Sequence, residues 1–173
     1  MQSFKLIDKK QNPSLGFNAE RYELDEYGSE HIHLKNDSKE IVFMVMFRTI
    51  PESSSGVAHI LEHTTLCGSE NYKVRDPFFM MLRRSMSTFM NAFTASDWTA
   101  YPFATQNKKD FFNLLDVYLD AVYFPILAEE DFKQEGHRIE FSKYDKSNSP
   151  LEYKGVVFNA VSYTHLTLPT NGT

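Results

Sequence analysis

The sequence predicts an α+β fold, in which helices pack on a mainly antiparallel β-sheet. Strand patterns come first along the chain, and a hairpin pattern and helical periodicity follow. The chain has no repeating strand–helix–strand units, which would indicate a parallel sheet. Its 173 residues, 42% of them hydrophobic, are enough for one domain with a real core.

The beginning of the chain predicts strands joined by tight turns. Residues 1–18 contain an early strand and a loop, and residues 21–25 and 30–35 flank a hairpin turn. His31 and His33 alternate on one face of the second hairpin strand. A solvated strand surface is favoured there over metal binding.

The next segment predicts a buried strand followed by a helix. Residues 41–47 form a continuous apolar run, which is typical of a central strand covered on both faces. Pro51 ends this strand, and residues 53–56 supply a loop and a candidate helix cap. The helix is expected to stop before Gly68. Gly68 itself is expected just past the helix end, in a left-handed conformation.

A second helix and a hairpin come next. Asp76 followed by Pro77 is a typical helix start, and the helix is expected to continue over residues 78–86. Residues 87–94 and 98–103 are rich in aromatic and β-branched side chains around a short polar turn, which predicts a β-hairpin.

Two further helices are expected in the second half of the chain. Asn107 and Asp110 resemble a capping box that opens a helix, and Pro125 stops it. Its apolar positions at helical spacing are Phe111, Leu114, Leu115, Tyr118 and Val122. Residues 129–131 are acidic and suit the first turn of another helix, rather than an acid–base pair. Phe132, Glu135, Ile139 and Glu140 are expected along that helix.

The residues with the clearest chemistry are His-Ile-Leu-Glu-His at positions 59–63. On a helix, His59 and His63 lie one turn apart on one face and could bind one metal ion. Glu62 lies beside the second histidine, where its carboxylate could take a proton from a metal-bound water. The spacing is the reverse of the zinc-peptidase motif His-Glu-x-x-His. The alternative is a surface helix that carries two histidines.

Composition argues against several kinds of partner and location. The formal charge of -5 and the lack of a dense Lys/Arg run argue against nucleic acid. Cys67 is the only cysteine, which rules out an internal disulfide framework and suits a reducing compartment. Residues 1–10 lack a signal-peptide core, and no segment approaches a membrane span. A cytoplasmic protein without a membrane partner is therefore expected.

Taken together, these features resemble the presequence-protease branch of the pitrilysin/insulinase zinc metallopeptidases, the inverzincins. The matching segments, in chain order, are residues 56–68, 75–79, 87–102, 134–136 and 153–159. The resemblance extends from about residue 17 to residue 159. It implies that residues 1–160 are a fragment of the N-terminal peptidase domain of a far longer enzyme. In this family two halves close around peptides inside a chamber, so the resemblance implies that the C-terminal remainder would be missing here.

The resemblance assigns roles to the motif. His59 and His63 would be zinc ligands, and Glu62 would be the general base. A catalytic zinc site needs three protein ligands and one open position. The family takes the third ligand from a Glu that follows a segment like residues 153–159, but position 160 is Ala160. Weak zinc binding and no appreciable peptidase activity are therefore expected for the 173-residue chain.

The resemblance also implies a substrate site and a reaction. Asn91, Ala92 and Phe93 match the family's edge strand beside the zinc, where a peptide substrate is added as an extra strand. The implied function is zinc-dependent endoproteolysis of short unstructured peptides. The alternative is a non-catalytic homologue that keeps the fold in a structural or interaction role. The intact histidine–glutamate motif favours the peptidase.

The end of the chain differs from the rest. Residues 161–173 contain no Asp, Glu, Lys or Arg, and four of them are Thr. The match to the family stops where this segment starts. The segment is therefore expected not to be native to the protein, and the alternative is a natural polar tail.

Overall fold

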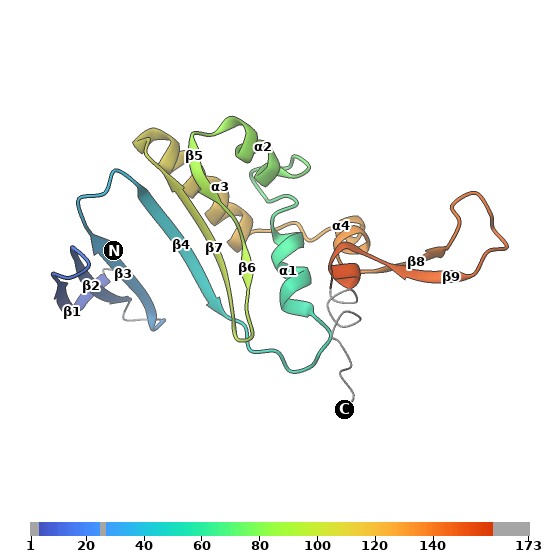
Figure 1. Cartoon of the computed structure of the whole chain (residues 1–173), viewed down its shortest axis with the longest axis horizontal. Coiled ribbons are helices and arrows are strands. Elements are labelled where there is room, and N and C mark those ends of the chain that lie inside the picture. Colours follow the sequence, from blue (N-terminus) through green and yellow to red (C-terminus); the bar gives the residue numbers. More distant parts are fainter. Residues whose placement is uncertain (1–3, 25–26, 161–173) are drawn as a thin grey trace, which may run out of the picture. The chain divides into compact units, whose positions relative to one another are not determined.

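The computed structural model describes residues 4–24 and 27–160, which fall into two compact units, Met1–Glu40 and Ile41–Thr173. The first unit is an antiparallel sheet with the strand order β1–β2–β3 (Figure 1). Its strands are β1 (Phe4–Asn12), β2 (Phe17–Leu24) and β3 (Ser29–Lys35). The strands and the hairpin expected in this part of the chain are confirmed, and the segment 161–173 lies outside the described residues.

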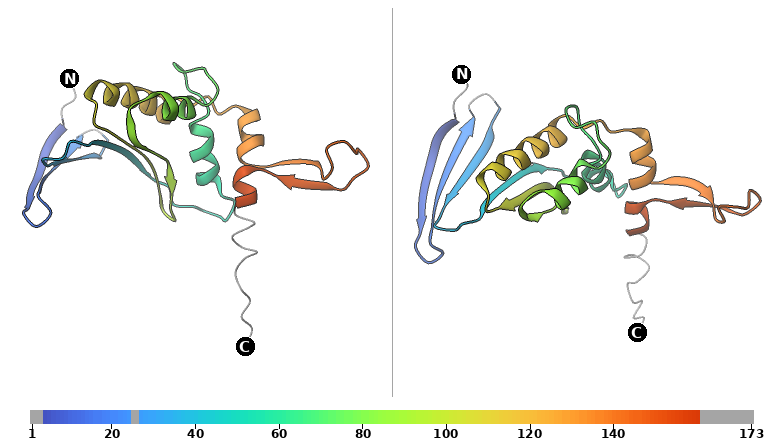
Figure 2. Two further views of the ribbon diagram at one scale, coloured as in Figure 1. Left: turned by 45° about the horizontal axis from the view of Figure 1, so that its top comes forward. Right: turned by 90° about the horizontal axis from the view of Figure 1, so that it is seen from above.

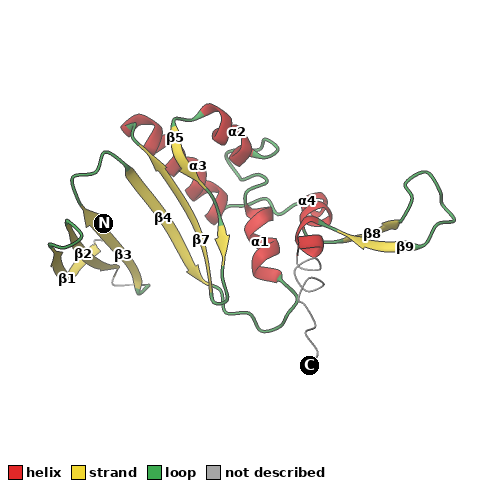
Figure 3. Ribbon diagram, in the orientation of Figure 1, coloured by secondary structure: helices red, strands yellow, loops and turns green. Residues whose placement is uncertain are grey.

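The second unit is built on a four-stranded antiparallel sheet. Its strands are β4 (Ile41–Arg48), β5 (Ser87–Met90), β6 (Phe93–Thr94) and β7 (Trp98–Thr105). The order is β4–β7–β5, and β6 also pairs with β7, so that β5 and β6 follow one another along the same side of β7. Figure 3 shows these strands in yellow. The expected hairpin is confirmed by the pairs Phe93–Ala100 and Thr94–Thr99.

The expectation that residues 41–47 form a central strand covered on both faces is wrong. Among the described residues β4 pairs only with β7, so it lies at an edge of the sheet. Val42, Met44 and Met46 are exposed on one face, and Phe43, Val45 and Phe47 are partly buried on the other. An apolar run contains no alternation, so the sequence could not indicate that one face is open. The central strand is β7, which is buried from Thr99 to Thr105.

Helices α1 to α3 complete this part of the second unit (Figure 2). They are α1 (Val57–Thr65), α2 (Pro77–Arg84) and α3 (Lys108–Tyr123). The core cluster joins β7 to α3, because Phe103 lies 5.0 Å from Tyr118 and 5.4 Å from Phe111 between ring centroids. Leu114 is fully buried in the same cluster. The apolar stripe expected on α3 therefore faces the sheet.

The helix starts were predicted better than their caps. Asn107 caps α3 by accepting hydrogen bonds from the backbone N–H groups of residues 109 and 110, as expected. The capping box is incomplete, because Asp110 accepts from the backbone N–H of Met86. Helix α2 begins after Asp76 but ends at Arg84, two residues earlier than predicted.

A glycine with a left-handed backbone lies at the start of α1, whereas the sequence predicted one after its end. Gly56 precedes the helix with φ of 73°, a conformation that costs glycine least. Gly68 has no positive φ, so that expectation is wrong. A Cβ on Gly68 would lie 3.4 Å from the Val74 carbonyl oxygen, which is an ordinary contact.

The last elements differ from the expected single helix over residues 129–140. Helix α4 (Glu129–Glu135) starts with the expected acidic turn but stops before Gly136. Ile139 and Glu140 belong to strand β8 (Arg138–Phe141), which pairs with β9 (Leu151–Lys154). The alternation of polar and apolar residues in β8 fits a strand. Pairing with β9, which is distant in the sequence, therefore outweighed the local preference for a longer helix. A further helix starts at residue 156.

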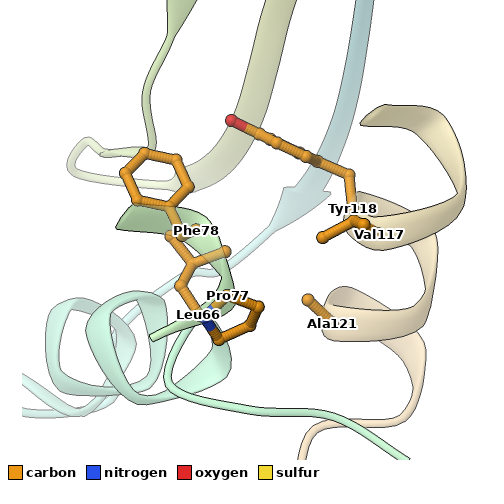
Figure 4. A pocket seen from close by; sticks show the side chains of 6 residues that line it. All are labelled: Leu66, Pro77, Phe78, Val117, Tyr118 and Ala121. Carbon is orange, nitrogen blue, oxygen red and sulfur yellow. The ribbon is translucent and has the colours of Figure 1, made fainter. Parts of the chain in front are cut away.

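The described part of the chain offers little internal space. A void of about 10 Å³ lies where the end of α1 meets α2 and α3 (Figure 4). Its lining is apolar and consists of Leu66, Pro77, Phe78, Val117, Tyr118 and Ala121. Such a void is about the size of one water probe and suits no ligand. No helix among the described residues is both long and apolar enough to cross a membrane.

Candidate metal and catalytic site

Helix α1 places the three motif side chains together. The prediction that residues 59–63 are helical is confirmed, and His59 and His63 lie one turn apart. Their ring centroids are 5.0 Å apart, with the planes inclined by 67°. Two imidazoles at this separation could supply two nitrogen ligands to one metal ion.

A carboxylate from α4 fixes the orientation of His63. Its Nδ1 atom lies 2.9 Å from Oε2 of Glu135. An ionised carboxylate only accepts hydrogen bonds, so a neutral His63 paired with it donates from Nδ1 and presents the lone pair of Nε2. A metal-binding histidine commonly has such a carboxylate partner. Sequence reasoning gave Glu135 no role, although it lies in one of the matching segments.

Glu135 is itself held by its neighbours. Its Oε1 atom accepts a hydrogen bond of 2.8 Å from Nε2 of Gln134. Gln134 in turn accepts one of 2.6 Å from the Arg75 guanidinium. These contacts link α4 to the loop between α1 and α2, and they restrict the Glu135 side chain beside His63.

Glu62 points to the other side, toward the sheet. Its side chain is buried, with 7% of the residue exposed. Oγ1 of Thr94, on β6, donates a hydrogen bond of 2.5 Å to its Oε2 atom. This bond leaves Oε1 as a proton acceptor. The predicted base therefore has a defined partner that the sequence did not indicate.

Two glycines bring the end of α4 close to both neighbouring segments. A Cβ on Gly136 would lie 3.2 Å from Cγ2 of Ile60, on α1. A Cβ on Gly155 would lie only 1.9 Å from the Gly136 carbonyl oxygen. The helix that starts at residue 156 and reaches Ala160 therefore begins directly against the end of α4.

The predicted substrate strand lies at an edge of the sheet. Asn91 and Phe93 are exposed and Ala92 is partly exposed. Phe93 belongs to β6, which pairs with β7 on one side, and no other described strand pairs with it. Helix α1 contacts β6, so this edge runs beside the histidine motif. The geometry is compatible with strand addition.

The described residues do not form a complete set of metal ligands. Within residues 4–24 and 27–160, no group of three or more His, Cys, Asp or Glu side chains is arranged to hold a metal ion. His59 and His63 fit a metal as two ligands, because both belong to one helical turn and Nε2 of His63 is available. Ala160 offers no ligand atom at the position where the third was expected.

The surroundings of Cys67 make its thiol unreactive. Burial, with smaller effects from Asp131 and Asp76, raises the pKa of its thiol to about 12. The thiol is therefore protonated at neutral pH and a poor nucleophile. It lies 3.5 Å from the carbonyl oxygen of His63, to which it can donate a weak hydrogen bond.

The loop after α1 is attached to α3. Asp120 accepts hydrogen bonds from the backbone and side chain of Asn71, at 3.0 and 2.6 Å. Burial acts to raise the pKa of Asp120, but the effect of hydrogen bonds, among them the two from Asn71, outweighs it and lowers this pKa. The loop is thereby held at neutral pH, where Asp120 is ionised.

A second pair of histidines lies in the first compact unit. His31 and His33 stack with ring centroids 6.4 Å apart. They line an open hollow of about 440 Å³ together with Phe4, Glu20 and Tyr22. Both histidines are exposed, as the predicted strand surface requires.

Comparison with known proteins gives strong sequence matches. The model of the family described as Insulinase (Peptidase family M16) matches residues 48–173. "Presequence protease, mitochondrial" of Xenopus tropicalis is 58% identical over 147 residues, which cover 85% of this chain and 14% of that protein. The protein of the same name from Schizosaccharomyces pombe is 50% identical over 159 residues, which cover 92% of this chain and 16% of that protein. The chain thus spans about one seventh of these relatives.

Solved structures give the same fold. The crystal structure of pitrilysin matches with a TM-score of 0.60 at 20% identity, over 75% of this chain and 14% of that one. A protease from Helicobacter pylori matches with a TM-score of 0.54 at 19% identity, over 76% of this chain and 28% of that one. The predicted α+β class, with a pitrilysin-like antiparallel sheet and packed helices, is confirmed.

The comparisons overturn one expectation. The relatives are named as mitochondrial proteins, so the cytoplasmic location inferred from composition is wrong. A single cysteine suits any reducing compartment, and that signal does not separate the cytoplasm from the mitochondrial matrix.

Proposed function

Because the chain belongs to the insulinase family of peptidases, family M16, we propose that it is part of a zinc-dependent endopeptidase of short unstructured peptides. The presequence-protease resemblance seen in the sequence is confirmed by the same matches. One observation carries the proposal: His59, Glu62 and His63 share one helix, and Glu135 orients His63. The full-length protein to which the chain would belong is here called the parent protein.

In this proposal each motif residue has a distinct task. His59 and His63 would hold zinc through ring nitrogens, and a third ligand would come from the parent protein. Zinc supplies Lewis acidity, which polarises a peptide carbonyl and makes a water easier to deprotonate. Glu62 takes the proton from that water and passes it to the leaving amine. Glu135 would keep the Nδ1 proton of His63 in place and so leave Nε2 as the atom that could bind the metal.

The substrate would bind along the edge formed by Asn91, Ala92 and Phe93. An extended peptide can pair with the backbone of this edge as an added strand, where the Ala92 N–H at present donates to Oδ1 of Asn91. Backbone pairing depends little on sequence, which suits a peptidase of unstructured peptides. The names of the relatives extend the proposal to presequence peptides and to mitochondria as the site of action.

A non-catalytic homologue is the second candidate, and Ala160 is the residue that favours it. The coding sequence after Asn159 separates the two. A Glu at position 160, followed by several hundred family-like residues, supports the peptidase. An in-frame Ala160 with a stop codon after Thr173 contradicts it.

The 173-residue chain itself is expected to bind zinc weakly and to have no appreciable peptidase activity. Two histidines without a third ligand leave the metal short of a complete catalytic site. The measurements are zinc titration by calorimetry and cleavage of an unstructured fluorogenic peptide, with and without a chelator. Chelator-sensitive cleavage by the purified chain would show that this expectation is wrong.

Replacing Glu135 should weaken zinc binding without unfolding the chain. Loss of an outer partner of a metal-binding histidine commonly costs about 10- to 100-fold in metal affinity. We therefore expect Glu135→Ala to lower the zinc affinity of the parent protein by about that factor. Calorimetric titration of the metal-free protein measures it.

Glu129→Ala is the matched control, because Glu129 lies on the same helix and pairs only with exposed Lys133 among the described residues. Its zinc affinity should match that of the unmodified protein. Equal affinities for both variants would remove Glu135 from the metal site.

A further inference from the structure

The carboxylate of Glu62 is held by a strand of the sheet rather than by its own helix. Oγ1 of Thr94 lies 2.5 Å from Oε2 of Glu62, which is a short hydrogen bond. Hydrogen bonds from a hydroxyl to a carboxylate are among the shorter and stronger ones in proteins. Because the residue is buried, water competes little for this contact.

Thr94 belongs to a row of hydroxyl groups that crosses the sheet. Its Oγ1 lies 3.4 Å from Oγ1 of Thr99 on β7. Oγ1 of Thr99 lies 2.9 Å from Oγ1 of Thr49, which follows β4. Thr94 and Thr99 are also direct backbone partners in the β6–β7 pairing. The row therefore joins Glu62 to three neighbouring parts of the second unit.

Proton counting identifies the main contact in this row. Each hydroxyl has one proton to donate, and an ionised carboxylate has none, so Thr94 donates to Glu62. Thr94 can then only accept from Thr99, over a contact of 3.4 Å that is long for two hydroxyl groups. Thr99 and Thr49 lie 2.9 Å apart, and either of them can be the donor. The short bond of the row is therefore the one between Thr94 and Glu62.

We infer that Thr94 is a positioning residue for the base: its hydroxyl fixes the Glu62 carboxylate relative to the β6 edge. The inference rests on the proposed function, because it concerns the same site. Thr94 is the residue after Phe93, so it belongs to the edge that would pair with the substrate. Strand β6 would then position both the added peptide and the Glu62 carboxylate, and so fix the two relative to each other.

The test compares two variants at this position of the parent protein. Thr94→Val keeps the shape and removes the donor, and Thr94→Ser keeps the donor. A misplacement of about 1 Å in a catalytic group can cost on the order of 100-fold in rate. We expect Thr94→Val to lower kcat by about 10- to 100-fold with KM within about twofold, and Thr94→Ser to restore most of kcat. If the valine variant does not fold, Thr94→Ala replaces it.

Thr105→Val is the matched control. Thr105 is a buried threonine of β7 whose hydroxyl donates to the Met86 carbonyl, away from Glu62. Its loss should lower stability but leave kcat unchanged. An equal fall in kcat in both variants would mean that Thr94 acts only through stability, and the inference would fail.

Crystal structures of the Thr94 variants give a readout that does not depend on activity. The Glu62 carboxylate should leave its position in Thr94→Val and keep it in Thr94→Ser. A carboxylate that stays in place in the valine variant overturns the inference, whatever the kinetics. If the unmodified parent protein cleaves no peptide, the proposed function fails, and the structures still decide the role of Thr94.

Discussion

Glu62→Gln in the parent protein should abolish turnover while leaving the zinc in place. Removing a general base typically costs about 10²- to 10⁴-fold, and we expect the upper part of this range because Glu62 would handle both proton transfers. Glutamine has nearly the same shape, and its amide oxygen can still accept the Thr94 hydrogen bond. The fold and the metal should therefore remain, because the proposed zinc ligands are His59 and His63.

Steady-state kinetics and metal analysis of the same preparation check this prediction. Glu70→Gln is a suitable control, since Glu70 is exposed in the loop after α1. Retained activity in Glu62→Gln would contradict the assignment of the base. Loss of zinc together with activity would instead indicate that Glu62 holds the metal.

Gly155→Ala should disrupt the proposed zinc site indirectly, by displacing the helix that carries position 160. The added Cβ would lie 1.9 Å from the Gly136 carbonyl oxygen, whereas an ordinary contact is at least 3.4 Å. The clashing oxygen belongs to the backbone and cannot rotate away as a side chain would. The helix starting at residue 156 must therefore move away from the end of α4. This helix carries position 160, where the third ligand is expected. A shift of more than about 1 Å there should cost over 100-fold in kcat/KM of the parent protein.

Overpacking of this kind should also lower the free energy of unfolding by about 1–3 kcal/mol. Urea unfolding of the parent protein and its variant measures it. Val156→Ala is the control: Val156 is the next residue and is 48% exposed, so losing its two methyl groups should change neither quantity much. Unchanged kcat/KM in Gly155→Ala would mean that the Gly136–Gly155 contact does not position residue 160.

The sequence predicted local features well where a single local signal decided them. The helical motif at 59–63, the Asn107 cap and the hairpin of β6 and β7 are confirmed because each depends on neighbours within a few residues. The prediction failed where a distant partner decided. Residues 139 and 140 became strand because β9 pairs with them, and β4 became an edge because of the strand order of the sheet.

By itself the sequence determined the family, the two histidines on one helical turn and the acidic residue between them. Those features are encoded in residue types and spacing, which need no tertiary contacts. Only the tertiary structure decided which groups support them: Glu135 on His63, Thr94 on Glu62 and Gly155 against Gly136. These partners lie 72, 32 and 19 residues apart in the sequence. Chain folding brings them together, and no local pattern predicts that.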